Sequence, residues 1–261
     1  MRKLFRIIFI IIALIAVIVI AGVALFLAKP DVVTKKGVVE VLSYVLKTDV
    51  KLDSADVSLS EGKCELKDLV INSPEGFNTK EAFSVGRVNV EFSPKIFNIM
   101  KPEIQGIMVE NPQINLEINT KGSNLGQLSK NASRLEKWKF KRIGDKVKIR
   151  KIIVDGAKVS MATTKFKDKT VSFGLHRIEM DNLGGENGIT VAGVIKAFFE
   201  KILKESLKSG REYISKLGDE AAIKGLRDAI SELPELKDKT GEAVKEGVKG
   251  LKDDVKDMLG Q

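Results

Sequence analysis

The chain has 261 residues and a formal net charge of +9, with 44 Lys and Arg residues against 35 Asp and Glu residues. A single histidine, His176, and a single cysteine, Cys64, exclude a histidine-cluster metal site and an internal disulfide. The sequence also lacks a Walker loop, a dinucleotide fingerprint and a CxxC pair. It therefore predicts no catalytic residues, no metal and no cofactor, and a non-enzymatic protein in which His176 and Cys64 are structural.

The first predicted element is a transmembrane helix over Ile7–Ala28. This stretch has 22 residues and no charge, which suffices to cross a hydrocarbon core about 30 Å thick. Arg2, Lys3 and Arg6 precede it, so the positive-inside rule keeps the N-terminus in the cytoplasm and places the rest outside. A cleaved signal peptide is the alternative, but its apolar region is usually only about 7 to 15 residues long. We interpret the segment as an uncleaved signal anchor.

After the anchor, Thr34–Lys47 has the apolar spacing of an amphipathic helix, which we expect to pack at the sheet edge nearest the membrane. From Val50 the hydrophobic period becomes two, which is typical of strands. Short helices are predicted at Pro94–Met100 and Asn124–Trp138. The predicted strands are Val50–Leu59, Lys63–Asn72, Phe83–Phe92, Ile104–Glu110, Gln113–Asn119, Val147–Asp155, Lys158–Phe166 and Val171–Met180.

One phrase recurs in these strands, with apolar residues at its first, fourth and sixth positions. The copies begin at Leu66, Ile104, Ile149 and Leu175. The step from first to fourth position changes the parity of the alternation, which a bulge or kink in the strand would absorb. We interpret the phrase as one strand-and-turn unit used repeatedly, although an antiparallel sheet can also produce such phrases by chance.

Three helices are predicted at the C-terminal end. Val191–Leu217 carries a broad apolar stripe. This helix either packs on the sheet, or it caps an open apolar groove or lies on a membrane surface. Ala221–Leu233 forms a second helix that ends before Pro234. Glu235–Gln261 has heptad-like apolar spacing but several glycines, so it is expected to be a marginal helix that orders only against a partner or a membrane.

The most basic segment is 130–151, which has ten Lys or Arg residues and two acidic residues. Nucleic acid is one partner for such a patch, but the predicted anchor argues against it, and an extracytoplasmic position favours anionic lipid headgroups or lipopolysaccharide phosphates. A solvated loop kept soluble by its lysines remains the alternative. The candidate headgroup-binding residues are Lys137, Lys139, Lys141 and Arg142.

The chain resembles AsmA-like envelope proteins over about residues 1–180. The segments that carry this resemblance are Thr48–Phe77, Phe83–Phe97 and Ile104–Leu128, in which Asn124, Leu125 and Leu128 match a recurring N-L-x-x-L turn. The resemblance implies a curled, gutter-shaped sheet whose apolar face holds acyl chains. It also implies a role, shared with TamB-like proteins, in phospholipid movement and outer-membrane assembly.

These observations predict an α+β protein with a single N-terminal transmembrane helix, a curled, mostly antiparallel sheet and a helical C-terminal tail. The expected parts are an anchor over 1–28, an extracytoplasmic domain over 29–188 and a helical region over 189–261. The expected location is the bacterial inner membrane with the bulk of the chain in the periplasm.

Phospholipid is the expected ligand, and the C-terminal helices can contact protein partners or a second copy. A scaffold or assembly factor with a sealed core is the alternative. The candidate groove residues are Leu69, Ile71, Ile107, Val109, Ile152 and Val154.

Overall fold

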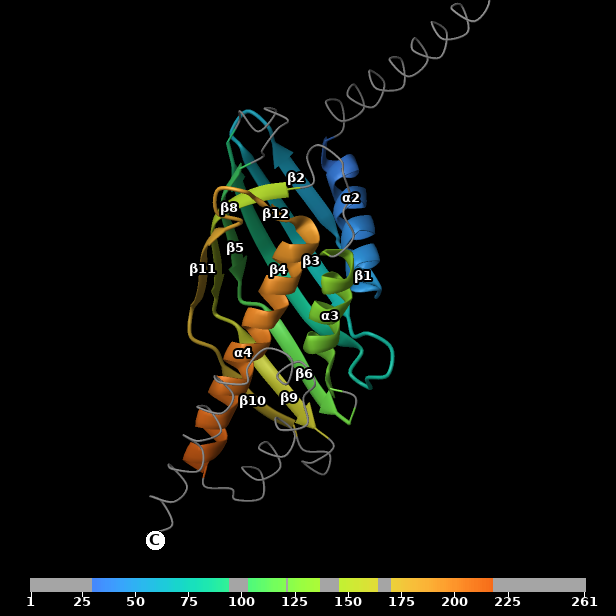
Figure 1. Ribbon diagram of the computed structural model, residues 1–261, viewed down its shortest axis with the longest axis vertical. Helices are drawn as coiled ribbons and strands as arrows, with labels where there is room; N and C mark the ends of the chain where they lie inside the picture. Colours follow the sequence, from blue (N-terminus) through green and yellow to red (C-terminus); the bar gives the residue numbers. More distant parts are fainter. Residues whose placement is uncertain (1–29, 94–102, 121, 137–145, 164–169, 218–261) are drawn as a thin grey trace, which may run out of the picture.

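The computed structural model describes residues 30–93, 103–120, 122–136, 146–163 and 170–217. Two of its helices, α3 and α4, lie over one face of a mixed β-sheet, and α2 lies beside the edge strand β2 (Figure 1). The helices are α2 (Pro30–Leu46), α3 (Asn124–Glu136) and α4 (Val191–Leu217). The strands are β1 (Val50–Lys51), β2 (Ser54–Ser58), β3 (Lys63–Asn72), β4 (Glu81–Phe92), β5 (Glu103–Glu110), β6 (Gln113–Asn119), β7 (Gly122–Ser123), β8 (Lys146–Asp155), β9 (Lys158–Thr163), β10 (Thr170–Gly174), β11 (Ile178–Leu183) and β12 (Ile189–Thr190).

Several of these strands are the two halves of one longer, bent strand. β5 and β6 both pair with β4, one after the other along its length. β8 and β9 pair with β5 and β6 in parallel, and paired residues differ by 45 positions throughout. β11 and β10 then pair with β8 and β9 in one antiparallel register, and the Leu175 amide donates to the Ala157 carbonyl between them. The described sheet therefore consists of six long strands, with β1 and β2 joined in the same way along β3.

The prediction of a mostly antiparallel sheet is wrong, because the sheet is mixed. The pairs β5–β8 and β6–β9 are parallel. α3 lies between β6 and β8 in the chain, so this connection is a crossover that returns the chain to the starting end, and the next strand enters parallel. The open gutter is also not observed, because α3 and α4 cover one face (Figure 1).

A line of bends, which we call the crease, crosses all six long strands. Asp68 on β3 lies opposite Gly86 on β4, between the pairs Lys67–Arg87 and Leu69–Val85. On each side of this line, every second side chain of a strand faces the helices. Across the line the interval is three residues, as between Leu66 and Leu69 on β3, so the alternation of the two faces shifts by one residue there. Three crease residues have the left-handed backbone that permits the change: Asp68 (φ 51°), Asn111 (φ 51°) and Gly156 (φ 65°). The crease consists of Asp53, Asp68, Gly86, Asn111, Gly156 and His176, all exposed.

The helices begin at side-chain caps that the sequence supplies. Ser123 Oγ accepts the amide of Gly126 at the start of α3, and Thr190 Oγ1 accepts the amide of Gly193 at the start of α4, both at 3.0 Å. Asp31 at the start of α2 instead accepts the amide of Val57 at 2.7 Å. This hydrogen bond joins the start of α2 to the edge strand β2.

Several predicted elements lie outside the described residues. They are the anchor over Ile7–Ala28, the short helix Pro94–Met100 and the helices Ala221–Leu233 and Glu235–Gln261. Among the helices that the structure does describe, none has the length and hydropathy needed to cross a membrane. The predicted strand Val171–Met180 is interrupted at the crease, and the predicted Val191–Leu217 helix is confirmed.

Candidate functional site

Three rows of apolar side chains cross the sheet on the face that α3 and α4 cover, and each row contributes one residue from each long strand. The lower row is Val50, Ile71, Phe83, Ile114, Val159 and Phe173. The middle row is Ala55, Leu66, Val88, Val109, Val154 and Ile178. The upper row is Val57, Cys64, Val90, Ile107, Ile152 and Met180.

Burial decreases from the lower row to the upper row. No side chain of the lower or middle row is more than 9% exposed, whereas every upper-row residue except Ile152 is only half-buried. The upper row lies at the end of the sheet where α2 begins, since Val57 is the residue bonded to Asp31. The apolar face is therefore closed at one end and less covered at the end where α2 begins.

All six predicted groove residues belong to this face. Ile107 and Ile152 are paired in the upper row, and Val109 and Val154 are paired in the middle row. Ile71 lies in the lower row, and Leu69 lies just below the crease with 8% exposure. The apolar spacing of the repeated phrase thus predicted residues that share one face of the sheet. It did not predict that helices cover most of these residues.

α4 covers the lower part of the face through aromatic and close backbone contacts. Phe83 contacts the rings of Phe198 and Phe199 edge-on, at centroid distances of 5.7 and 6.3 Å. Further along the helix, a Cβ on Gly210 would lie 3.0 Å from Phe173, so the helix backbone approaches β10 closely there. Of the two interpretations of Val191–Leu217, packing on the sheet is the one observed.

A buried polar cluster fixes α3 and the loop after β3. Asn124 is fully buried, and its Oδ1 accepts the amides of Glu117 and Leu125 at 3.1 and 2.9 Å. Its Nδ2 donates to the Asn115 carbonyl and to Ser73 Oγ, so all of its hydrogen-bonding groups are used. Leu125, the next residue, is also fully buried. Asn124 therefore has a structural role.

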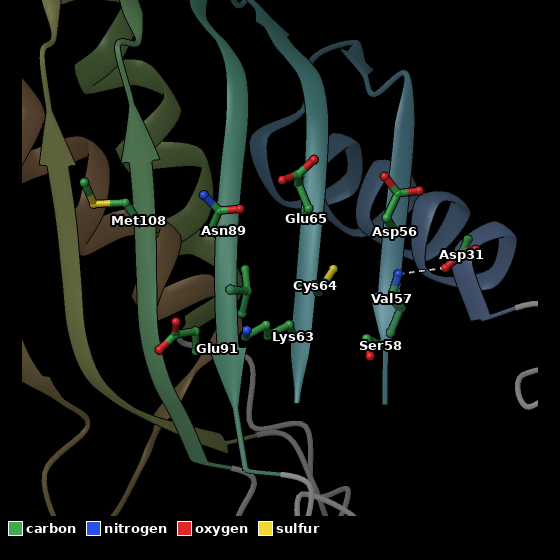
Figure 2. Close-up of a pocket in the computed structure, with 11 residues that line it drawn as sticks. Asp31, Asp56, Val57, Ser58, Lys63, Cys64, Glu65, Asn89, Glu91 and Met108 are labelled. Carbon is green, nitrogen blue, oxygen red and sulfur yellow. Dashed lines mark hydrogen bonds between the residues drawn. The ribbon is translucent and has the colours of Figure 1, made fainter. Parts of the chain in front are cut away.

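The opposite face of the sheet carries a shallow trough of about 630 Å³ (Figure 2). Carboxylates of Asp56, Glu65 and Glu91 line it, together with Lys63 and Met108, and the upper-row residues Val57, Cys64 and Val90 also border it. Lys67 lies 2.5 Å from Asp56 and 3.2 Å from Glu65, and these hydrogen bonds raise the pKa of the lysine ammonium. Neighbouring lysines thus already neutralise part of this acidic surface.

Cys64 and His176 show no sign of chemistry. Burial, followed by the charges of Asp31 and Asp56, raises the pKa of the Cys64 thiol to about 11, so the thiol is protonated at neutral pH. His176 is exposed in the crease. In the part of the chain that the structure describes, no three His, Cys, Asp or Glu residues are placed to hold a metal ion.

The candidate headgroup residues Lys137, Lys139, Lys141 and Arg142 lie outside the described residues. No family profile matches the chain, and no curated protein matches it in sequence.

Proposed function

We propose that this chain is a non-enzymatic envelope protein that binds phospholipid by holding acyl chains against the upper part of its apolar face. The observation that carries the proposal is the decrease in burial from the lower row to the upper row. The upper-row side chains are partly exposed on both sides of the buried Ile152, and such apolar surface is available to an acyl chain. The proposed contact residues are Cys64, Val90 and Ile107, at the end of the sheet where α2 begins.

The sequence supports the remaining parts of this proposal. The uncharged stretch 7–28 and the basic residues before it favour attachment to the inner membrane with the sheet in the periplasm. Lys137, Lys139, Lys141 and Arg142 supply positive charges for a lipid phosphate. The resemblance to AsmA-like proteins favours the same role in envelope biogenesis.

The proposal is tested by purifying the full chain in a mild detergent and measuring bound phospholipid by mass spectrometry. Ile107→Arg should reduce bound phospholipid at least about tenfold, because a charge in the upper row must be desolvated by an acyl chain. Met108→Arg is the matched control, since this neighbouring half-buried residue lines the trough on the opposite face. Equal lipid content in the two variants, or no phospholipid in the unaltered protein, would contradict the proposal.

A scaffold or assembly factor with a sealed core is the second candidate function. The contacts of Phe83 with Phe198 and Phe199 favour it, because they fill the lower part of the face with the protein's own side chains. Under this alternative the purified chain carries no phospholipid, and its partners dock on other surfaces.

A further inference from the structure

α4 has a polar side chain, Ser206, among the apolar residues of its buried face. Ser206 is fully buried, and its hydroxyl has no hydrogen-bond partner among the described residues. Phe199, Leu203 and Gly210 lie one or two helical turns from it and are also buried, so Ser206 faces the sheet. Because a buried hydroxyl without a partner costs free energy, the seated helix is less stable than an all-apolar helix would be.

The outer side of α4 is basic. The helix contains six Lys or Arg residues and three Glu residues, and Lys204 and Lys208 are exposed. A helix with an apolar stripe opposite a basic surface is the form that binds the interface of an anionic membrane. Both the sheet and such a membrane can therefore cover the same apolar stripe.

From these two features we propose that α4 is an exchangeable cap: it leaves the sheet for an anionic bilayer surface and so uncovers the lower and middle rows for acyl chains. The inference rests on the proposed function, because the uncovered face needs a ligand. The membrane replaces the sheet and α3 as the apolar surroundings of Phe199, Ile202 and Leu203. Electrostatic attraction between α4 and anionic lipid favours the released form.

The exchange is measured as a distance between spin labels in the full chain reconstituted into vesicles. One label is placed on α4 by Lys204→Cys and one on β3 by Lys63→Cys, both exposed positions, with the native thiol removed by Cys64→Ala. A second, longer distance should appear in vesicles of phosphatidylglycerol mixed with phosphatidylcholine and be absent from pure phosphatidylcholine. The control pair replaces the α4 label by Lys130→Cys on α3, and its distance should be the same in both vesicles.

Ser206→Ala provides the decisive variant. In the seated helix the hydroxyl has no partner among the described residues, whereas at a membrane interface it can reach water and headgroup oxygens. Removing it therefore favours the seated helix, and the population with the longer distance should fall about fivefold or more. One unchanged distance in both vesicle types would overturn the inference, as would an equal released population in Ser206→Ala. The proposed function is judged separately by the phospholipid bound to Ile107→Arg and Met108→Arg.

Discussion

Gly156 in the crease is a position where one added methyl group should lower the stability of the fold. Its φ of 65° is left-handed, which costs a residue with a Cβ about 1 to 2 kcal/mol. The Cβ of an alanine would also overlap Asn111 Oδ1 and lie 3.1 Å from Asn111 Cγ, so the Asn111 side chain must move. Gly156→Ala should therefore reduce the free energy of unfolding by about 2 to 3 kcal/mol and lower the Tm by roughly 4 to 12 °C.

Thermal and urea unfolding of the full chain, followed by circular dichroism, measures this effect. Gly106→Ala is the matched control, because Gly106 on β5 has ordinary φ and open space at its Cβ, so its Tm should stay the same or rise. Adding Asn111→Gly to Gly156→Ala should recover the part of the loss that comes from the overlap. Equal Tm values for the two alanine variants would refute the assignment of strain to the crease.

Asn124→Ala should cost about 3 kcal/mol in urea unfolding, because it leaves the buried amides of Glu117 and Leu125 without an acceptor; Gln113→Ala, at an exposed side chain, should cost less than about 0.5 kcal/mol. The pKa of the Glu179 carboxyl is lowered mainly by its hydrogen bond from Lys151, so stabilisation by this pair is present at neutral pH and is lost as the pH falls through that lowered pKa. Lys151→Ala should raise the Glu179 pKa in a carboxyl NMR titration, and an unchanged value would contradict the pairing. Since the Cys64 pKa is about 11, only about one thiol in a thousand is ionised at pH 8, and alkylation should be far slower there than at pH 11.

The parity change in the repeated phrase coincides with the crease in two of its four copies. It lies between Leu66 and Leu69 at Asp68 and between Leu175 and Ile178 at His176, whereas the apolar positions of the other two copies all lie before the bends at Asn111 and Gly156. The copies at Ile104 and Ile149 lie side by side in parallel register. A single sequence could not reveal that the bends align, because alignment depends on the register between strands.

The parallel pair and the covered face were missed for different reasons. The helix predicted over Asn124–Trp138 lies between two predicted strands, which is the usual sign of a parallel crossover, yet the sheet was predicted as mostly antiparallel. The apolar stripe of Val191–Leu217 predicted a covered surface, but the stripe is equally suited to a sheet and to a membrane. Ser206 had no signal at all in the sequence, since its lack of a partner depends on what packs around it.

The crease also determines which insertions and deletions the chain can tolerate. On every long strand, the middle-row and lower-row residues are five positions apart, as Leu66 and Ile71 are on β3. Deleting one residue between them would exchange the two faces of half of that strand and place charged side chains under the helices. The other five long strands would stay in place. Homologous chains should therefore vary in length at their loops, where a residue can be gained or lost without moving any row.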